Sequence, residues 1–74
     1  MAKFEVGCMY EPYASELEPI KIIRRTNKTI WAKNECTEWM MRIKKDEYGN
    51  EYAVDSSVPN KWREAFTYKA EWTV

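Results

Sequence analysis

Hydrophobic and polar residues alternate along much of this chain, and the alternation predicts a protein built from β-strands. From Lys3 to Tyr10 every second residue is apolar, which is the period of a strand with one buried face. The same period returns from Tyr68 to Val74. We therefore expect one strand to open the domain and another to end it.

The centre of the chain, from Pro19 to Ser56, is expected to fold as two consecutive antiparallel β-hairpins. Residues 26–28 form the first turn, in which an asparagine adopts a left-handed conformation readily. Residues 47–50 form the second loop, where a glycine is followed by an asparagine. The first turn places Ile22 opposite Ala32 in the hairpin.

Two further pairings follow from these turns. The first hairpin is expected to place Ile23 opposite Trp31, so that apolar groups meet on both faces of the sheet. In the second hairpin, residues 38–45 form one strand, and the loop places Ile43 opposite Val54. A register shifted by one residue would put Val54 opposite an arginine, so the apolar pattern favours the first register.

Two segments depart from strand periodicity. Residues 11–18 contain a proline and three glutamates, and they are expected to form an acidic connecting loop. Residues 59–66 follow serines and begin with a proline, which predicts one short helix or 3-10 turn. Trp62 shares one face of that segment with Ala65 and Phe66, so core packing explains it.

The order of these elements predicts a single domain over residues 1–74, mainly β. We expect a small barrel, or a strongly bent antiparallel sheet of five to six strands, with the short helix or 3-10 turn near 59–66. The layout resembles SH3-like barrels, through the opening strand Phe4–Tyr10 and through Val58-Pro59 before the last strand. An open α+β sheet with the helix on one face is the alternative.

A second resemblance comes from the centre of the chain. The segments Arg25–Ile30 and Asp46–Tyr52 are similar to those of small uncharacterised single-domain proteins of Firmicutes and their mobile elements. This resemblance implies an intracellular bacterial or phage origin, and it implies no particular activity.

Composition narrows the chemistry. The chain has no histidine, the commonest general base and metal ligand, and the spacing of Cys8 and Cys36 indicates neither a zinc site nor a disulfide framework. No apolar run is long enough to span a membrane, and no signal peptide is indicated, so we expect a cytoplasmic protein. These observations favour a binding module without a cofactor, a bound metal or a small-molecule substrate over an enzyme.

Charge is unevenly distributed, although the net charge is zero. Residues 1–18 carry a net charge of −3, residues 19–45 carry +6 and residues 46–74 carry −3. Because side chains alternate along a strand, basic and apolar residues of the hairpins are expected to share one sheet face. The candidate binding residues on this face are Lys21, Ile23, Arg25, Trp31, Lys33, Met40, Arg42 and Lys44.

Two functions fit this face. The first is a protein interface or a homodimer contact centred on Trp31, since exposed tryptophan is common at binding hot spots. The second is single-stranded nucleic-acid binding, in which cations contact phosphates and a ring stacks on bases. The acidic loop with Glu11, Glu16 and Glu18 also fits a phage or mobile-element inhibitor that imitates nucleic-acid phosphates.

Two simpler explanations remain open for the same residues. Acidic neighbours such as Asp55 and Glu51 would neutralise the cations, leaving a solvated surface. The sequence pI of about 6.3 also argues against a strong polyanion binder. Trp31 would alternatively belong to a second small core covered by the helix near the C-terminus.

Overall fold

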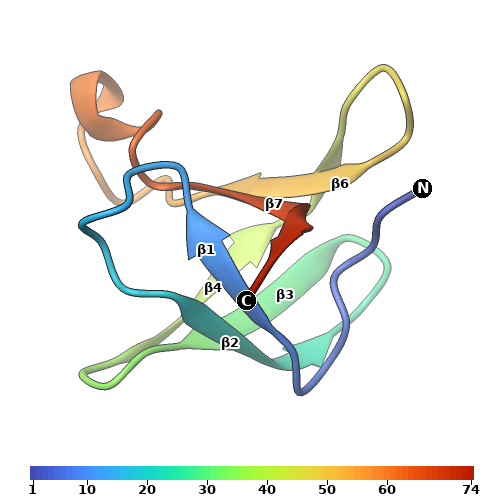
Figure 1. Cartoon of the computed structure of the whole chain (residues 1–74), viewed down its shortest axis with the longest axis horizontal. Helices are drawn as coiled ribbons and strands as arrows, with labels where there is room; N and C mark the ends of the chain where they lie inside the picture. The colour runs from blue at the N-terminus through green and yellow to red at the C-terminus, as the bar shows by residue number, and fades with distance from the viewer.

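The computed structural model describes residues 1–74, and its regular secondary structure consists of β-strands and one 3-10 turn (Figure 1). Seven antiparallel strands form one sheet. They are β1 (Met9–Pro12), β2 (Ile20–Arg25), β3 (Thr29–Lys33), β4 (Glu38–Arg42), β5 (Lys44–Lys45), β6 (Glu51–Val54) and β7 (Thr67–Thr73). A 3-10 turn, η1 (Asn60–Trp62), precedes β7. The expected mainly β fold is confirmed, and because no α-helix forms, the open α+β alternative is wrong.

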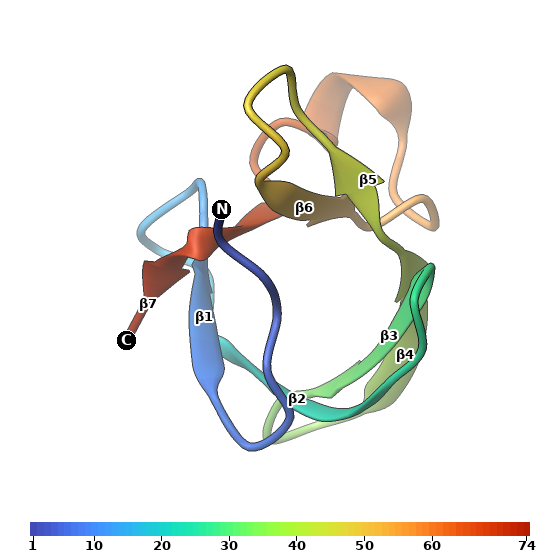
Figure 2. The same ribbon diagram turned by 90° about the vertical axis from the view of Figure 1, so that its right-hand side faces the viewer.

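The sheet curls into a nearly closed barrel (Figure 2). The strands are ordered β4-β3-β2-β1-β7-β6-β5, so β4 and β5, although consecutive in the chain, form the two edges of the sheet. The first strand also pairs with the last, because β1 lies between β2 and β7. The stretch expected as one strand over 38–45 is interrupted at Ile43, where β4 ends and β5 begins. This interruption lets one stretch of chain pair with β3 and then with β6.

The core fills the inside of the barrel with alternate residues of the strands. Phe4 and Tyr10 meet edge to face, with their ring centroids 5.0 Å apart. The small side chains of Ala32, Ala53 and Ala70 leave room for these rings inside a narrow barrel. The buried apolar residues are Phe4, Tyr10, Ile20, Ile22, Ile30, Ala32, Met41, Ala53, Tyr68 and Ala70.

The opening strand is shorter than expected. Only Met9 to Pro12 are paired in β1, and the acidic loop accordingly begins after Pro12. Gly7 has a φ of +90°, so the chain turns there instead of continuing extended, and Val6 is exposed. The residues before the turn cross one open end of the barrel, which Figure 2 shows in front. Phe4 in this segment is 1% exposed and belongs to the core.

The first hairpin forms with one change of register. Ile22 lies opposite Ala32 as expected. The register then shifts, so that Trp31 faces Arg24 and not Ile23. An extra residue in one strand is a β-bulge, which bends and twists the sheet, and barrel closure requires such bending. The expected pairing of Ile23 with Trp31 is therefore wrong.

The second hairpin is reduced to β5 and β6, and its expected register is wrong. Lys44 pairs with Tyr52, whereas Val54 pairs with Thr67 of β7 and not with Ile43. The loop is set by Asp46, whose Oδ1 accepts hydrogen bonds from two backbone amides of the loop. The apolar pattern misleads because the chain leaves one strand pair for another at Ile43.

Residues near the C-terminus match the prediction in part. The expected 3-10 turn is confirmed as η1, and the terminal strand is confirmed as β7. Trp62, however, is 54% exposed, so its expected core packing is wrong. Trp72 is half-buried against Tyr13 of the acidic loop, with ring centroids 6.1 Å apart. None of the helical turns is long and apolar enough to cross a membrane.

Candidate binding surface

The outer surface of β2, β3 and β4 carries the candidate site, which we call the basic face. Ile30, Ala32 and Met41 point into the core, so the alternate side chains of the same strands point outward. Strand register places Trp31 opposite Met40 on this outer surface. The basic face consists of the outward residues Lys21, Arg24, Trp31, Lys33, Met40 and Arg42.

An arginine and a tryptophan form the centre of the basic face. The guanidinium carbon of Arg24 lies 4.6 Å from the ring centroid of Trp31, which is the arrangement of a cation–π contact. Trp31 is half-buried under this contact, while Met40 beside it is 60% exposed. The 3-10 turn lies against none of the strands of this face, so it does not cover Trp31. The centre is thus an aromatic and thioether surface open to solvent.

The cations of the basic face form no salt bridge, although Glu38 of β4 lies directly opposite Lys33. The molecule contains one salt bridge, and it joins Arg25 to Glu51. No carboxylate therefore lies within ion-pairing distance of Lys21, Lys33 or the arginines of the face. Lys21 and Lys33 are directly opposite each other across β2 and β3, an arrangement in which like charges repel. Of the cations proposed from the sequence, only Arg25 is neutralised, by Glu51, and Asp55 forms no salt bridge, so the basic face keeps a net positive charge.

Three of the eight residues proposed from the sequence do not belong to this face. Ile23 lies in the bulge and is half-buried. Arg25 pairs with the core residue Ile30 and points to the inner side. Lys44 lies beyond the interruption at Ile43, on β5, so it is outside the three strands of the face, but it lines the same hollow as Met40 and Arg42. Five proposed residues do come together on the outer surface: Lys21, Trp31, Lys33, Met40 and Arg42.

Arg24 was absent from the residues proposed from the sequence. Strict alternation from Lys21 selects Arg25 as the outward arginine, and the bulge at Ile23 exchanges the roles of the two. The only signal in the sequence is that two arginines are adjacent, so either one can face outward. The bulge itself has no residue signature in this strand.

Arg25 instead fastens the segment that closes the barrel. Its Nη1 donates hydrogen bonds to the Phe4 carbonyl at 2.6 Å and to Glu51 Oε1 at 2.7 Å. The Phe4 amide in turn donates to Glu51 Oε1 at 2.8 Å. Burial alone raises the pKa of Glu51, but the hydrogen bonds from Arg25 and Phe4 outweigh burial and lower it. Hydrogen bonding to Glu51 raises the pKa of Arg25.

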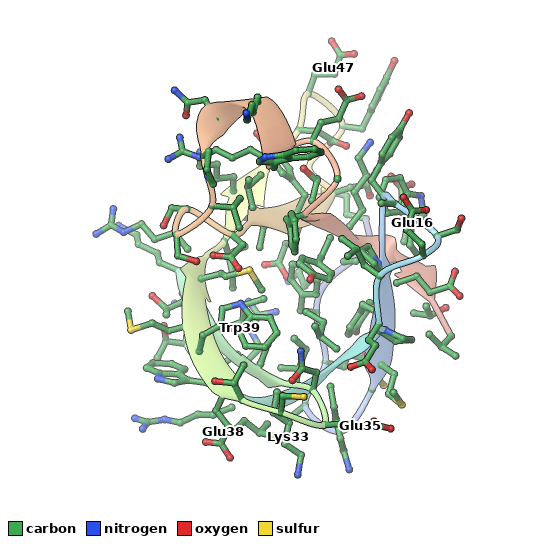
Figure 3. All side chains as sticks on the ribbon, turned by 90° about the vertical axis from the view of Figure 1, so that its left-hand side faces the viewer. Glu16, Lys33, Glu35, Glu38, Trp39 and Glu47 are labelled. Carbon is green, nitrogen blue, oxygen red and sulfur yellow. The ribbon has the colours of Figure 1, made fainter.

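The opposite end of the barrel is lined by polar and aromatic side chains. Figure 3 looks into this end, with Trp39 inside the ring and Lys33 and Glu38 pointing away from it. The indole nitrogen of Trp39 is buried without a hydrogen-bond partner. A hollow of about 280 Å³ lies beside it, lined in part by Asp55 and Tyr68. Burial, with a smaller contribution from the Asp55 charge, raises the pKa of Tyr68 to about 12.

Groups that could hold a metal or act as nucleophiles are dispersed. No three Cys, Asp or Glu side chains gather as a metal site would require. Both cysteines are free thiols: Cys8 is half-buried, and Cys36 is exposed on the loop between β3 and β4. The Cys8 thiol donates to Glu5 Oε2 at 3.7 Å.

The comparisons with protein-family models, curated proteins and solved structures found no match.

Proposed function

We propose that this chain is a non-enzymatic binding module that takes an acidic protein partner on its basic face. The observation that carries the proposal is a group of four outward cations without ion pairs, set around Trp31 and Met40. Protein interfaces are enriched in tryptophan, methionine and arginine, and a desolvated tryptophan often dominates the binding energy. The repulsion between Lys21 and Lys33 would be relieved by an acidic partner.

The partner can be another protein or a second copy of the chain. Glu11, Glu16 and Glu18 are all exposed near the acidic loop, so each molecule also presents a surface of the opposite charge. Contact between the basic face of one copy and the acidic loop of another would give a salt-sensitive homodimer or chain of copies. Light scattering that returns only monomers at high concentration and low salt would reject self-association and leave a separate protein as the partner.

Binding of single-stranded nucleic acid is the second candidate. The flat Arg24–Trp31 pair is the observation that favours it, because bases stack on both tryptophan rings and guanidinium planes. A cytoplasmic location and a bacterial or phage origin agree with both candidates and remain proposals. The likeness to SH3-like barrels also remains a proposal.

A titration with two probes tests these candidates. A poly-glutamate peptide should bind with an affinity that falls as salt rises, and Trp31→Ala and Arg42→Ala should abolish the binding. Trp62→Ala and Lys61→Ala are matched controls, because Lys61 lies 5.6 Å from the exposed Trp62 ring outside the basic face. These controls should bind normally. Tight binding of oligo-thymidine without binding of the peptide would favour nucleic acid, and loss of both would reject the basic face.

A further inference from the structure

β4 is an edge strand of the sheet: β6 lies near it, but no strand is hydrogen-bonded to its far side. β4 pairs with β3 along its whole length, and no ladder joins β4 to β6 on the other side. β6 pairs instead with β5 and β7. The barrel is therefore open between β4 and β6, next to the point where the chain is interrupted at Ile43.

The hydrogen bonds between β3 and β4 show which backbone groups of β4 face away from β3. The Ile43 amide donates to the Lys28 carbonyl, and the Asn34 amide donates to the Thr37 carbonyl. In an antiparallel pair, residues bonded to the partner strand alternate with residues whose backbone groups point away. Trp39 and Met41 therefore bond to β3, and the amides and carbonyls of Glu38, Met40 and Arg42 face the opening.

A groove of about 620 Å³ lies along this edge. On one side it is bounded by Met40, Met41 and Arg42 of β4. On the other side it is bounded by Val54 of β6 and by residues that follow η1. An extended chain placed here would find unpaired backbone groups along β4 and apolar side chains beneath it. This is the arrangement used in β-strand addition.

The charge of the groove specifies the chemistry of its occupant. Arg42, Lys44 and Arg63 line it, against the single carboxylate of Glu64. The Arg63 guanidinium donates to the carbonyls of Ser56 and Val58, so its position is set without an acidic partner. A strand with acidic side chains on its outer face would meet these cations, while its alternate side chains would point to the inner side of the sheet.

We propose that the edge of β4 binds an extended acidic peptide segment of a partner protein as an additional strand. This inference rests on the proposed function and specifies it further, because Met40 and Arg42 belong both to the basic face and to this edge. β4 carries neither a proline nor an inward charge, features that commonly protect sheet edges from pairing.

A synthetic peptide that alternates valine and glutamate over the length of β4 is the probe for this mode. Two versions should be compared, with backbone N-methyl groups on one or the other set of alternate residues. Strand addition predicts that only one set blocks binding, with a loss of about tenfold for each strand hydrogen bond removed. A version with lysine in place of glutamate should not bind. Equal binding of both N-methylated versions would overturn the edge proposal.

Amide hydrogen exchange gives a second readout on the protein. The amides of Met40 and Arg42 should exchange fast in the free protein and slowly with the peptide bound, whereas those of Trp39 and Met41 should be slow in both states. Met40→Pro should weaken binding far more than Met40→Ala, since both variants lose the thioether but only proline also removes the amide that faces away from β3. If Met40→Pro does not fold, amide hydrogen exchange and the N-methylated peptides still test strand addition on the unmodified protein.

The outcomes separate this proposal from the proposed function. Binding that needs Trp31 but leaves Met40 and Arg42 amides unprotected would reject strand addition and keep an acidic partner on the basic face. Absence of binding by this peptide and by poly-glutamate would reject both proposals.

Discussion

Arg25 and Glu51 are joined by two parallel hydrogen bonds, of 2.7 and 2.9 Å, which connect the end of β2 to the start of β6. Glu51 is only 2% exposed, and it also holds the Phe4 amide. The pair therefore links two distant strands to the N-terminal segment that closes the barrel. The pair contributes most to the free energy of unfolding when both partners are charged, since either charge alone would be buried without compensation.

Acid should destabilise the protein through this pair. The pKa of Glu51 is lower in the folded chain than its ordinary value of 4.5. Its contribution is therefore complete above about pH 4.5 and is lost as the pH falls through the lower, folded-state value. Denaturant unfolding at a series of pH values should show this loss, and Glu51→Gln should remove most of it. An unchanged acid profile in Glu51→Gln would contradict the assignment.

Removing one partner of the pair should destabilise the protein more than protonating Glu51 does. Arg25→Ala leaves a buried carboxylate, and we expect a loss of about 3 kcal/mol in the free energy of unfolding. Arg24→Ala, one residue earlier on the exposed outer face, should cost about 1 kcal/mol through its contact with Trp31. Equal losses for the two variants would show that the bulge does not separate the two arginines.

Alkali should also weaken the fold, with the opposite sign of pH dependence. Burial raises the pKa of Tyr68 from 10.0 to about 12, so the unfolded chain loses this proton first. Stability should fall between about pH 10 and pH 12, by roughly 2–3 kcal/mol. Burial also raises the pKa of Tyr10 and adds to the effect. Ultraviolet titration of Tyr68→Phe should lose the phenol that ionises last; an unchanged titration would refute the assignment.

The opposed lysines of the basic face should limit stability. Lys21→Glu replaces a like-charge pair by an attractive pair with Lys33, and we expect a gain of about 0.5 kcal/mol at low salt. Lys21→Gln should give about half that gain, and high salt should reduce both. The same Lys21→Glu variant should bind an acidic partner more weakly. A stability that does not respond to either substitution would show that the lysines do not repel each other.

The turn before β1 should depend on glycine. Gly7 has a φ of +90°, where a side chain is strained, and no neighbouring atom lies within 4 Å of the site of an added Cβ. Gly7→Ala should therefore cost about 1–2 kcal/mol through backbone strain alone. Gly7→Asn should cost less, because asparagine tolerates positive φ more readily. Thermal unfolding of both variants measures the difference, and equal costs would point to a lost contact instead.

The sequence was sufficient for the features that depend on local chemistry. Alternation placed β7, and the proline before Asn60 marked the 3-10 turn. The turn at residues 26–28 set Ile22 opposite Ala32. It also placed Trp31 and Met40 on the outer surface, because side-chain alternation is a property of any strand.

Other features depended on barrel closure, which no single segment of the chain records. Closing the sheet requires a bulge at Ile23 and an interruption at Ile43. The bulge changes the partners of Arg24 and Arg25, and the interruption transfers the chain from pairing with β3 to pairing with β6. The bulge turned Arg25 inward to Glu51 and brought Arg24 onto Trp31. Glu51, which binds Arg25, also accepts a hydrogen bond from the Phe4 amide, 47 positions away in the chain.

The chain by itself thus determined that a basic, aromatic surface would lie on the central strands, because periodicity and charge are carried by neighbouring residues. Tertiary structure alone decided which cations remain unpaired and which strand edge stays open. Both depend on how a twisted sheet closes into a barrel, and that geometry is set by the packing of all its strands together.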